Sequence, residues 1–202
     1  KEIKKDCDII LEPFAKNTAP ALALAALQGQ SEKILLVMPS DHIIGNNKNF
    51  LKQIKKALDI IKDNKIVTFG VLPSSANTNY GYIKTSEDKI QLGQKVLEFV
   101  EKPNIEKAKK YIKSKNYFWN SGIFLISSSL YLQELQNHSP EVLNICRYTL
   151  ETMSSELEFK NFDRCAYAKC PAISIDYAIM EHTKKAVLLP LNSDWSDLGT
   201  WI

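Results

Sequence analysis

Two aspartates, Asp41 and Asp197, each lie just beyond a predicted strand and could do chemistry together. The run Ile34–Met38 is apolar throughout and is stopped by Pro39, a pattern typical of a strand buried on both faces of a parallel sheet. Ligands of open α/β folds bind outside the carboxyl ends of such strands. Two carboxylates there would suit Mg²⁺, which leaves other positions for phosphate oxygens and water. The alternative is that each aspartate only shapes a turn.

Other polar groups stand near the ends of predicted strands. Glu101 could accept hydrogen bonds from sugar hydroxyls, and neighbouring Lys102 could neutralise a phosphate. Asn120 could bind a hydroxyl, while Gly81, between two tyrosines, allows a ligand to approach the backbone closely. The structural alternatives are a solvated charged turn for the first pair and an Asx turn for the asparagine.

A predicted helix start supplies a third group of candidates. The residues concerned are Asn17, Thr18 and Ala19. The Ala- and Leu-rich stretch through Leu27 predicts a helix with Thr18 as its N-cap and Gly29 as its stop. Backbone amides at a helix N-terminus can bind a base or an anion.

Composition and missing motifs exclude several classes. A net charge of +3, with no basic stripe interleaved with aromatic residues, excludes a nucleic-acid footprint. The four cysteines form no CxxC pair, which favours free thiols in a reducing cytoplasm. No apolar run is long enough to span a membrane, so we expect no membrane partner. The chain has no GxGxxG, P-loop or GxSxG motif, and His42, His138 and His182 form no recognisable metal-ligand set.

The element pattern alternates along the first part of the chain. We predict a strand at Asp8–Glu12, a helix at 18–27, a strand at Ile34–Met38, an amphipathic helix over Phe50–Ile61 and a strand at Ile66–Leu72. Such alternation predicts an α/β fold, with a mostly parallel sheet and helices on both faces. Absence of a repeat or linker favours a single domain over residues 1–202.

The second part of the chain is less regular. Its predicted strands are Tyr80–Lys84, Lys95–Glu101, Gly122–Ile126 and Ala186–Pro190. Its predicted helices are Ile105–Ser114, a helix capped at 127–129 and running through Leu135, one opened by Ser139 and Pro140, and Ile175–Glu181 capped by Ser174.

Seven segments, each of low specificity as a motif by itself, occur together in a characteristic order. They are Glu12–Ala21, Met38–His42, Phe69–Val71 with Tyr80–Ile83, Phe99–Pro103, Trp119–Phe124, Ser174–Glu181 and Trp195–Trp201. Over nearly its whole length the chain resembles the sugar-1-phosphate nucleotidyltransferases, above all those that join mannose 1-phosphate to GTP. The resemblance implies a Rossmann-like, glycosyltransferase-A-like core with an added sugar-binding half.

The resemblance also implies residue roles. Asp41 and Asp197 would hold magnesium, and Asp41 would also lie beside the nucleotide. Lys102 would bind the sugar phosphate and, with the two aspartates, carry the catalysis. The guanine would lie beside Asn17, Thr18 and Ala19, and the mannose beside Gly81, Glu101 and Asn120. A mannose 1-phosphate oxygen would attack the α-phosphorus of GTP and release pyrophosphate.

Two departures from the family pattern bear on activity. The basic residue before the NTAP segment is Lys16, where the family usually has Arg, so bidentate geometry is lost. No glycine-rich loop with Arg and Lys, which grips the triphosphate in the family, precedes Asp8. We therefore expect the chain to lack that N-terminal segment and to need a complementing segment, or to act in a homo-oligomer.

Two alternatives stay open. One is another sugar-1-phosphate nucleotidyltransferase, using glucose 1-phosphate with UTP or dTTP. The other is a catalytically impaired sugar-nucleotide-binding fragment or regulatory subunit, which would bind without turnover.

Overall fold

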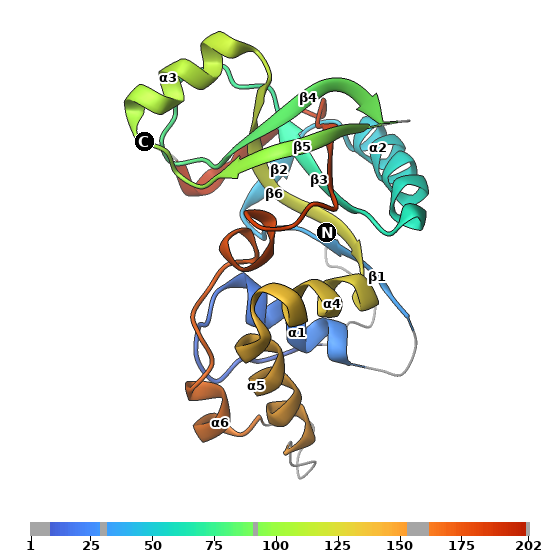
Figure 1. Ribbon diagram of the computed structural model, residues 1–202, viewed down its shortest axis with the longest axis vertical. Helices are drawn as coiled ribbons and strands as arrows, with labels where there is room; N and C mark the ends of the chain where they lie inside the picture. Colours follow the sequence, from blue (N-terminus) through green and yellow to red (C-terminus); the bar gives the residue numbers. More distant parts are fainter. Residues whose placement is uncertain (1–8, 29–31, 91–92, 153–161, 201–202) are drawn as a thin grey trace.

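A twisted six-stranded sheet lies mostly in the upper part of the computed structural model as drawn in Figure 1, and the structure describes residues 9–28, 32–90, 93–152 and 162–200. Its strand order is β1-β6-β3-β7-β5-β4, and β4 also pairs with β6. A separate two-stranded sheet joins β2 to β8. The strands are β1 (Ile34–Val37), β2 (His42–Ile44), β3 (Ile66–Val71), β4 (Tyr82–Ile90), β5 (Gly93–Val100), β6 (Tyr117–Ser127), β7 (Ala186–Pro190) and β8 (Trp195–Asp197).

Helices gather mainly at one end of the molecule, where α1, α4, α5 and α6 lie together, while α2 and α3 lie beside the sheet (Figure 1). The α-helices are α1 (Thr18–Leu27), α2 (Asn47–Ile60), α3 (Ile105–Ser114), α4 (Ser128–His138), α5 (Pro140–Glu151) and α6 (Arg164–Ala168). Single turns form η1 (Ile61–Asp63), the π-helical η2 (Asp176–Met180) and η3 (Leu198–Thr200).

The α/β character is confirmed, but the prediction of a mostly parallel sheet is wrong. Among the described strands, only β3 and β7 pair in parallel, and every other pairing is antiparallel. The reason is β6, a long strand that runs antiparallel to all three strands with which it pairs, β1, β3 and β4. The short connection between β4 and β5 adds a hairpin, which must also be antiparallel.

Strand β1 is also not buried on both faces, as its apolar run predicted. It lies at an edge of the sheet, where Ile34 is 55% exposed and Leu36 is 40% exposed. An apolar run shows that a strand can be covered, but its neighbours decide whether it is covered. In the described part of the chain, β6 is the only strand that pairs with β1.

Local corrections concern the N-terminal part of the chain. Residues 9–12 form no strand, and Ile9 is 67% exposed because no strand pairs with this segment. Helix α1 has the predicted bounds, but its N-cap is Asn17 rather than Thr18, since the Asn17 side chain accepts a hydrogen bond from the Thr18 amide. The predictions for Asp8 and Gly29 fall outside the described residues.

Helices cover both faces of the central strands, as predicted. On β6, Phe124 and Ile126 belong to the apolar cluster that contains α1, α4 and α5. Their neighbours Ile123 and Leu125 belong to a second cluster, which contains α2. Side chains alternate along a strand, so both faces of β6 are buried and the strand is rigidly held. The polar residues of β6 just before Ile123 therefore belong to a strand that is held firmly on both faces.

No helix among the described residues is long and apolar enough to cross a membrane. Three of the cysteines, Cys146, Cys165 and Cys170, are free thiols, as predicted, whereas Cys7 lies outside the described residues.

A buried hydrogen bond joins α4 to the start of α1. The hydroxyl of Tyr131, a fully buried side chain, donates to the Ala19 carbonyl at 2.8 Å. We expect Tyr131→Phe to lower the free energy of unfolding by about 0.5–1.5 kcal/mol, the usual contribution of one such bond. Urea denaturation measures this change, with Tyr148→Phe as the matched control because Tyr148 is exposed. Equal stability of the two variants would contradict the expectation.

Candidate active site

The pairing of β2 with β8 brings two distant aspartates together. In its register His42 lies opposite Asp197, and the amide of Leu198 donates to the Asp41 carbonyl at 3.0 Å. One ligand atom each from Asp41, His42 and Asp197 lies within 4.8 Å of the other two. The Asp41 side chain is 59% exposed, so the group is open to solvent on one side. The geometry thus places both predicted metal ligands within the span of one cation.

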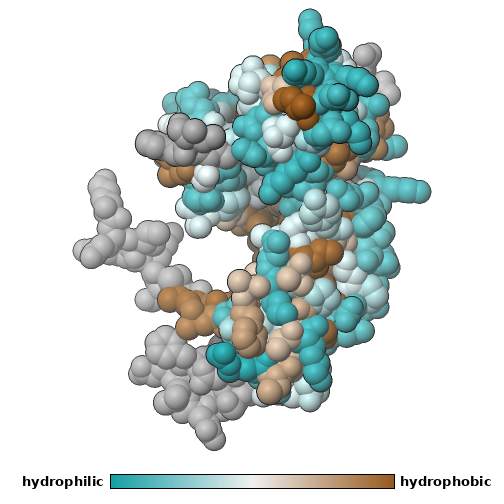
Figure 2. Space-filling view, turned by 90° about the vertical axis from the view of Figure 1, so that its left-hand side faces the viewer, coloured by the Kyte–Doolittle hydropathy of each residue, from teal (hydrophilic) through white to brown (hydrophobic). Residues whose placement is uncertain are grey.

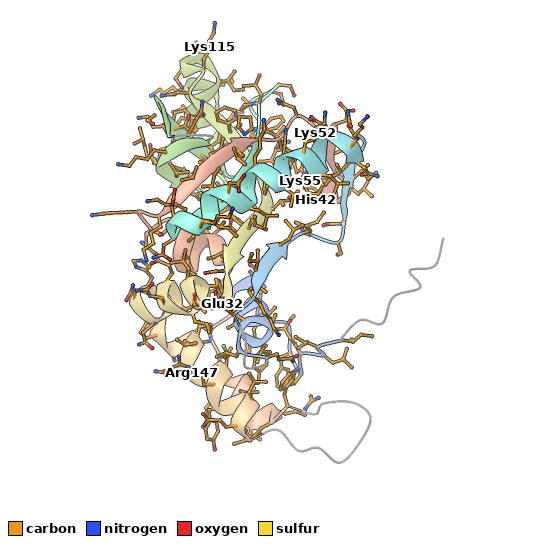
Figure 3. The ribbon with its side chains drawn as sticks, turned by 90° about the vertical axis from the view of Figure 1, so that its right-hand side faces the viewer. Glu32, His42, Lys52, Lys55, Lys115 and Arg147 are labelled. Atoms are coloured by element: carbon orange, nitrogen blue, oxygen red, sulfur yellow. The ribbon has the colours of Figure 1, made fainter. Side chains whose placement is uncertain are left out.

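His42 is a member of this group that the sequence analysis did not select. Its Nε2 lies 3.9 Å from an oxygen of each aspartate, and its Nδ1 accepts a hydrogen bond from the Trp195 indole at 3.2 Å. In a neutral imidazole whose Nδ1 accepts, the proton sits on Nε2 and faces the two carboxylates. Figure 3 shows His42 just beyond the end of β1. The sequence signal was its place directly after Asp41.

The donor set of this group fits a hard divalent cation. Two carboxylates supply the oxygen ligands that Mg²⁺ prefers, with room for phosphate oxygens and water. His42 Nε2 could act as a ligand only in the other neutral tautomer, in which Nδ1 carries the proton and no longer accepts from the Trp195 indole. Asp197 is also held in place, because its Oδ1 accepts from the Gly199 amide at 2.8 Å. Asp41 and Asp197 are therefore the two side chains suited to hold the cation.

A cavity of about 260 Å³ adjoins this group. The molecular surface is hollowed at mid-height, between the end that carries α1, α4 and α5 and the end that carries most of the sheet (Figure 2). Polar residues that line the cavity are Thr18, His42, Asn79, Tyr80, Glu101, Asn120, Ser121, Asp176 and Asp197. Gly81 lines it as well, so the three residues predicted to bind a sugar share one cavity.

Glu101 lies directly over Gly81. A Cβ at position 81 would come within 2.4 Å of Glu101 Oε2 and 3.3 Å of the Asn120 Cβ. The backbone N–H of Asn120 also donates a hydrogen bond to the Gly81 carbonyl at 2.8 Å. Only a residue without a side chain allows this close approach, which explains the glycine between two tyrosines.

The Glu101 carboxyl is an unusual acid. Burial, and next the charge of Asp176, raise the pKa of Glu101 to about 7, although Lys102 acts in the opposite direction. Its Oε2 is buried and has no hydrogen-bond partner among the described residues. A buried acceptor without a hydrogen-bond partner is costly. A ligand whose hydroxyl group donates a hydrogen bond to this oxygen would therefore be favoured.

Asp176 is the second residue that the sequence analysis did not select as a site residue, although it lies within the Ser174–Glu181 segment. It stands at the start of η2, and its Oδ1 accepts from Asn120 Nδ2 at 2.8 Å. Burial raises the pKa of Asp176, while its hydrogen bonds, that from Asn120 first, act against this shift. The cavity therefore contains a hydrogen-bonded Asp176–Asn120 pair beside Glu101.

The remaining predicted residues lie at different distances from the cavity. Thr18 lines it, whereas Asn17 caps α1 and Ala19 is fully buried. Lys102 is exposed, has a φ of 45° and does not line the cavity. Lys16 points elsewhere, because its Nζ donates to the Ala168 carbonyl at 2.7 Å. Among the described residues, no Lys or Arg lines the cavity.

Comparison with known proteins gives the following findings. The family described as nucleotidyl transferase matches residues 1–202. A mannose-1-phosphate guanylyltransferase from Salmonella muenchen is 46% identical over 199 residues, which cover 96% of this chain and 42% of that protein. The chain thus spans less than half the length of the curated relatives it matches.

Two solved structures are also similar. One is titled mannose-6-phosphate isomerase from Helicobacter pylori: it is 36% identical, with a TM-score of 0.84 over 93% of this chain and 73% of that chain. The other is titled mannose-1-phosphate geranyltransferase from Thermus thermophilus: it is 30% identical, with a TM-score of 0.81 over 95% of this chain and 55% of that chain.

The raised pKa of Glu101 predicts a pH-dependent stability. The folded-state pKa of about 7 lies above the ordinary value of 4.5, so ionising Glu101 destabilises the folded state. The free energy of unfolding of the wild type, relative to Glu101→Gln, should therefore fall as pH rises from 5 to above 7. Urea denaturation at several pH values measures this difference. Glu106→Gln, which removes an exposed carboxylate from α3, is the control, and parallel profiles for wild type and Glu101→Gln would contradict the prediction.

Proposed function

The chain belongs to the nucleotidyl transferase family, and on that premise we propose that it carries the catalytic core of a mannose-1-phosphate guanylyltransferase. This enzyme would join mannose 1-phosphate to GTP, giving GDP-mannose and pyrophosphate. The observation that carries the proposal is the single cavity in which a carboxylate pair adjoins groups suited to sugar hydroxyls. Similarity to proteins named for this activity supports the choice of substrates.

Asp41 and Asp197 are the residues that would hold magnesium in this proposal. When bound, the cation would neutralise phosphate charge at the reacting centre. Asp41 directly precedes β2, and Asp197 is the last residue of β8, the strand that pairs with β2. His42 lies close to both aspartates. The chemistry needs positioning and charge neutralisation more than proton transfer, so acidic side chains on a paired backbone suit it.

The sugar half of the site would consist of Glu101, Asn120 and Gly81. The unpaired Glu101 oxygen would accept from a hydroxyl, and Asn120 would supply an amide contact. Lys102, exposed beside the cavity, would meet the sugar phosphate by turning its side chain inward. At the start of α1, Thr18 lines the cavity, and Asn17 and Ala19 stand next to it, where guanine would lie.

In the reaction, a phosphate oxygen of mannose 1-phosphate would attack the α-phosphorus of GTP. One bond forms between that oxygen and the phosphorus, while the bond to the β-phosphate oxygen breaks and pyrophosphate leaves. The residues of this chain would align the two substrates and offset their charge.

The triphosphate needs cationic partners that the described cavity does not supply, because no Lys or Arg lines it. We propose that residues 1–202 form one nucleotidyltransferase domain and that polypeptide outside them grips the triphosphate. The open edge of β1 supports this, since an apolar groove flanks it on the side of α1, and a groove with both charged and apolar residues flanks it on the side of α2. A second copy of the chain would be the other way to cover that edge. The free thiols fit the reducing cytoplasm, which we propose as the location.

Glucose 1-phosphate with UTP or dTTP is the alternative substrate pair, because an amide and a carboxylate accept either sugar. We expect the polypeptide, as its source expresses it, to make GDP-mannose faster than UDP- or dTDP-glucose.

Asp197→Asn should lower the rate of GDP-mannose formation by about 100-fold or more, because a neutral amide cannot match the charge of a metal site. Asp59→Asn, an exposed change on α2, is the control. A retained rate in Asp197→Asn would argue against the metal assignment, and preference for UTP or dTTP would argue against guanylyl transfer.

A separate prediction concerns residues 1–202 by themselves. We expect this chain to fold but to form GDP-mannose at least about 100-fold more slowly than the polypeptide as its source expresses it, since lost charge-stabilising contacts cost this much. Binding of mannose 1-phosphate, measured by calorimetry, should persist because the sugar residues are present. Rapid synthesis by residues 1–202 would show that another group grips the triphosphate. Binding with no turnover in either form would favour a regulatory subunit.

A further inference from the structure

Asn120 is held at both ends of its side-chain amide. Its Oδ1 accepts from the Gly122 amide at 3.0 Å, and its Nδ2 donates to Asp176 Oδ1 at 2.8 Å. A backbone N–H can only donate and an ionised carboxylate can only accept, so these two partners determine which way the amide points. One N–H of Nδ2 is left over after these contacts.

The backbone just before Asp176 is hydrogen-bonded to another part of the cavity. The amide of Ile175 donates to Thr18 Oγ1 at 2.9 Å, next to the start of α1. The segment just before it is tied in the same way, because the Ala19 amide donates to the Ile173 carbonyl at 3.1 Å. One short segment, 173–176, therefore contacts both the start of α1, at Thr18, and the Asn120 side chain of β6.

We propose that Asp176 is a positioning residue of the sugar site, which orients the Asn120 amide so that its remaining N–H donates to a sugar hydroxyl. This inference deepens the proposed function and rests on it. It differs from the roles given to Glu101 and Asn120, because Asp176 acts through another side chain rather than on the sugar itself.

Loss of the Asp176 carboxylate would free the amide. With an alanine at position 176, the Nδ2 group loses its acceptor and the amide can rotate about its last side-chain bond. Asp176→Asn offers a carboxamide oxygen at the same place, so it can accept the same hydrogen bond while removing the charge. The two variants therefore separate orientation of Asn120 from the charge that Asp176 exerts on Glu101.

The first test observes the amide without any substrate, in the polypeptide as its source expresses it. Side-chain ¹⁵N–¹H spectra of asparagine report hydrogen bonding of Asn120, with Asn120→Ala used to assign its pair of signals. We expect Asp176→Ala to shift these signals and speed their exchange with water, and Asp176→Asn to preserve them. Unchanged signals in Asp176→Ala would overturn the inference whatever the substrate is.

The second test measures KM for mannose 1-phosphate and for GTP. We expect Asp176→Ala to raise the first by about 10-fold, the equivalent of one hydrogen bond, and the second by less than about 2-fold. Asp176→Asn should recover most of the loss, and adding Asn120→Ala to Asp176→Ala should cost no more than Asn120→Ala alone. Asp163→Ala, which removes the carboxylate that caps α6, controls for a general loss of packing.

Equal effects on both substrates, or additive effects of the two alanine changes, would overturn the positioning role. A wild type that binds and converts no mannose 1-phosphate would overturn the proposed function and the sugar contact together. The spectra would then decide by themselves whether Asp176 orients Asn120.

Discussion

The antiparallel pairing of β2 with β8 is the constraint on which the candidate site depends. These strands are short, and their register sets His42 opposite Asp197. Backbone hydrogen bonds hold the two segments at a fixed spacing, which keeps Asp41 and Asp197 near each other despite the mutual repulsion of their carboxylates when both are ionised. A cation between them would relieve that repulsion. The backbone pairing thus sets the positions of the two carboxylates, and a bound cation would offset their negative charge.

Strand β6 has the corresponding role for the sugar half of the proposed site. It pairs with β1, β3 and β4, and both of its faces are buried beyond Gly122. Gly122 has a φ of 69°, a conformation that glycine adopts without strain. A Cβ there would come within 3.1 Å of the Pro39 ring, so β6 packs closely against the loop that leads to Asp41. The two parts of the proposed site, for the metal and for the sugar, are in contact here.

The charges that line the cavity bear on which ligands the proposed site would accept. Glu101, Asp176 and Asp197 all line it, and burial makes the negative charge of Glu101 and Asp176 expensive. Hydroxyl donors and a divalent cation both reduce that cost, whereas an anion alone would increase it. Under the proposed function, a sugar phosphate accompanied by a metal ion would therefore fit the cavity better than a free phosphate would.

Local interactions determine where several helices and strands begin and end, so the sequence by itself was sufficient to predict those bounds. Helices α1 and α3 and strand β7 have their predicted bounds, because caps, turn residues and apolar periodicity act over a few residues. Asp41, Glu101 and Asn120 were selected because they stand near the ends of predicted strands and within the motifs of the resemblance, and their roles stay predictions. Tertiary structure alone decided the mixed sheet, the open edge of β1 and the places of His42 and Asp176. These features depend on which segments, far apart in the chain, pair and pack, and no local pattern carries that information.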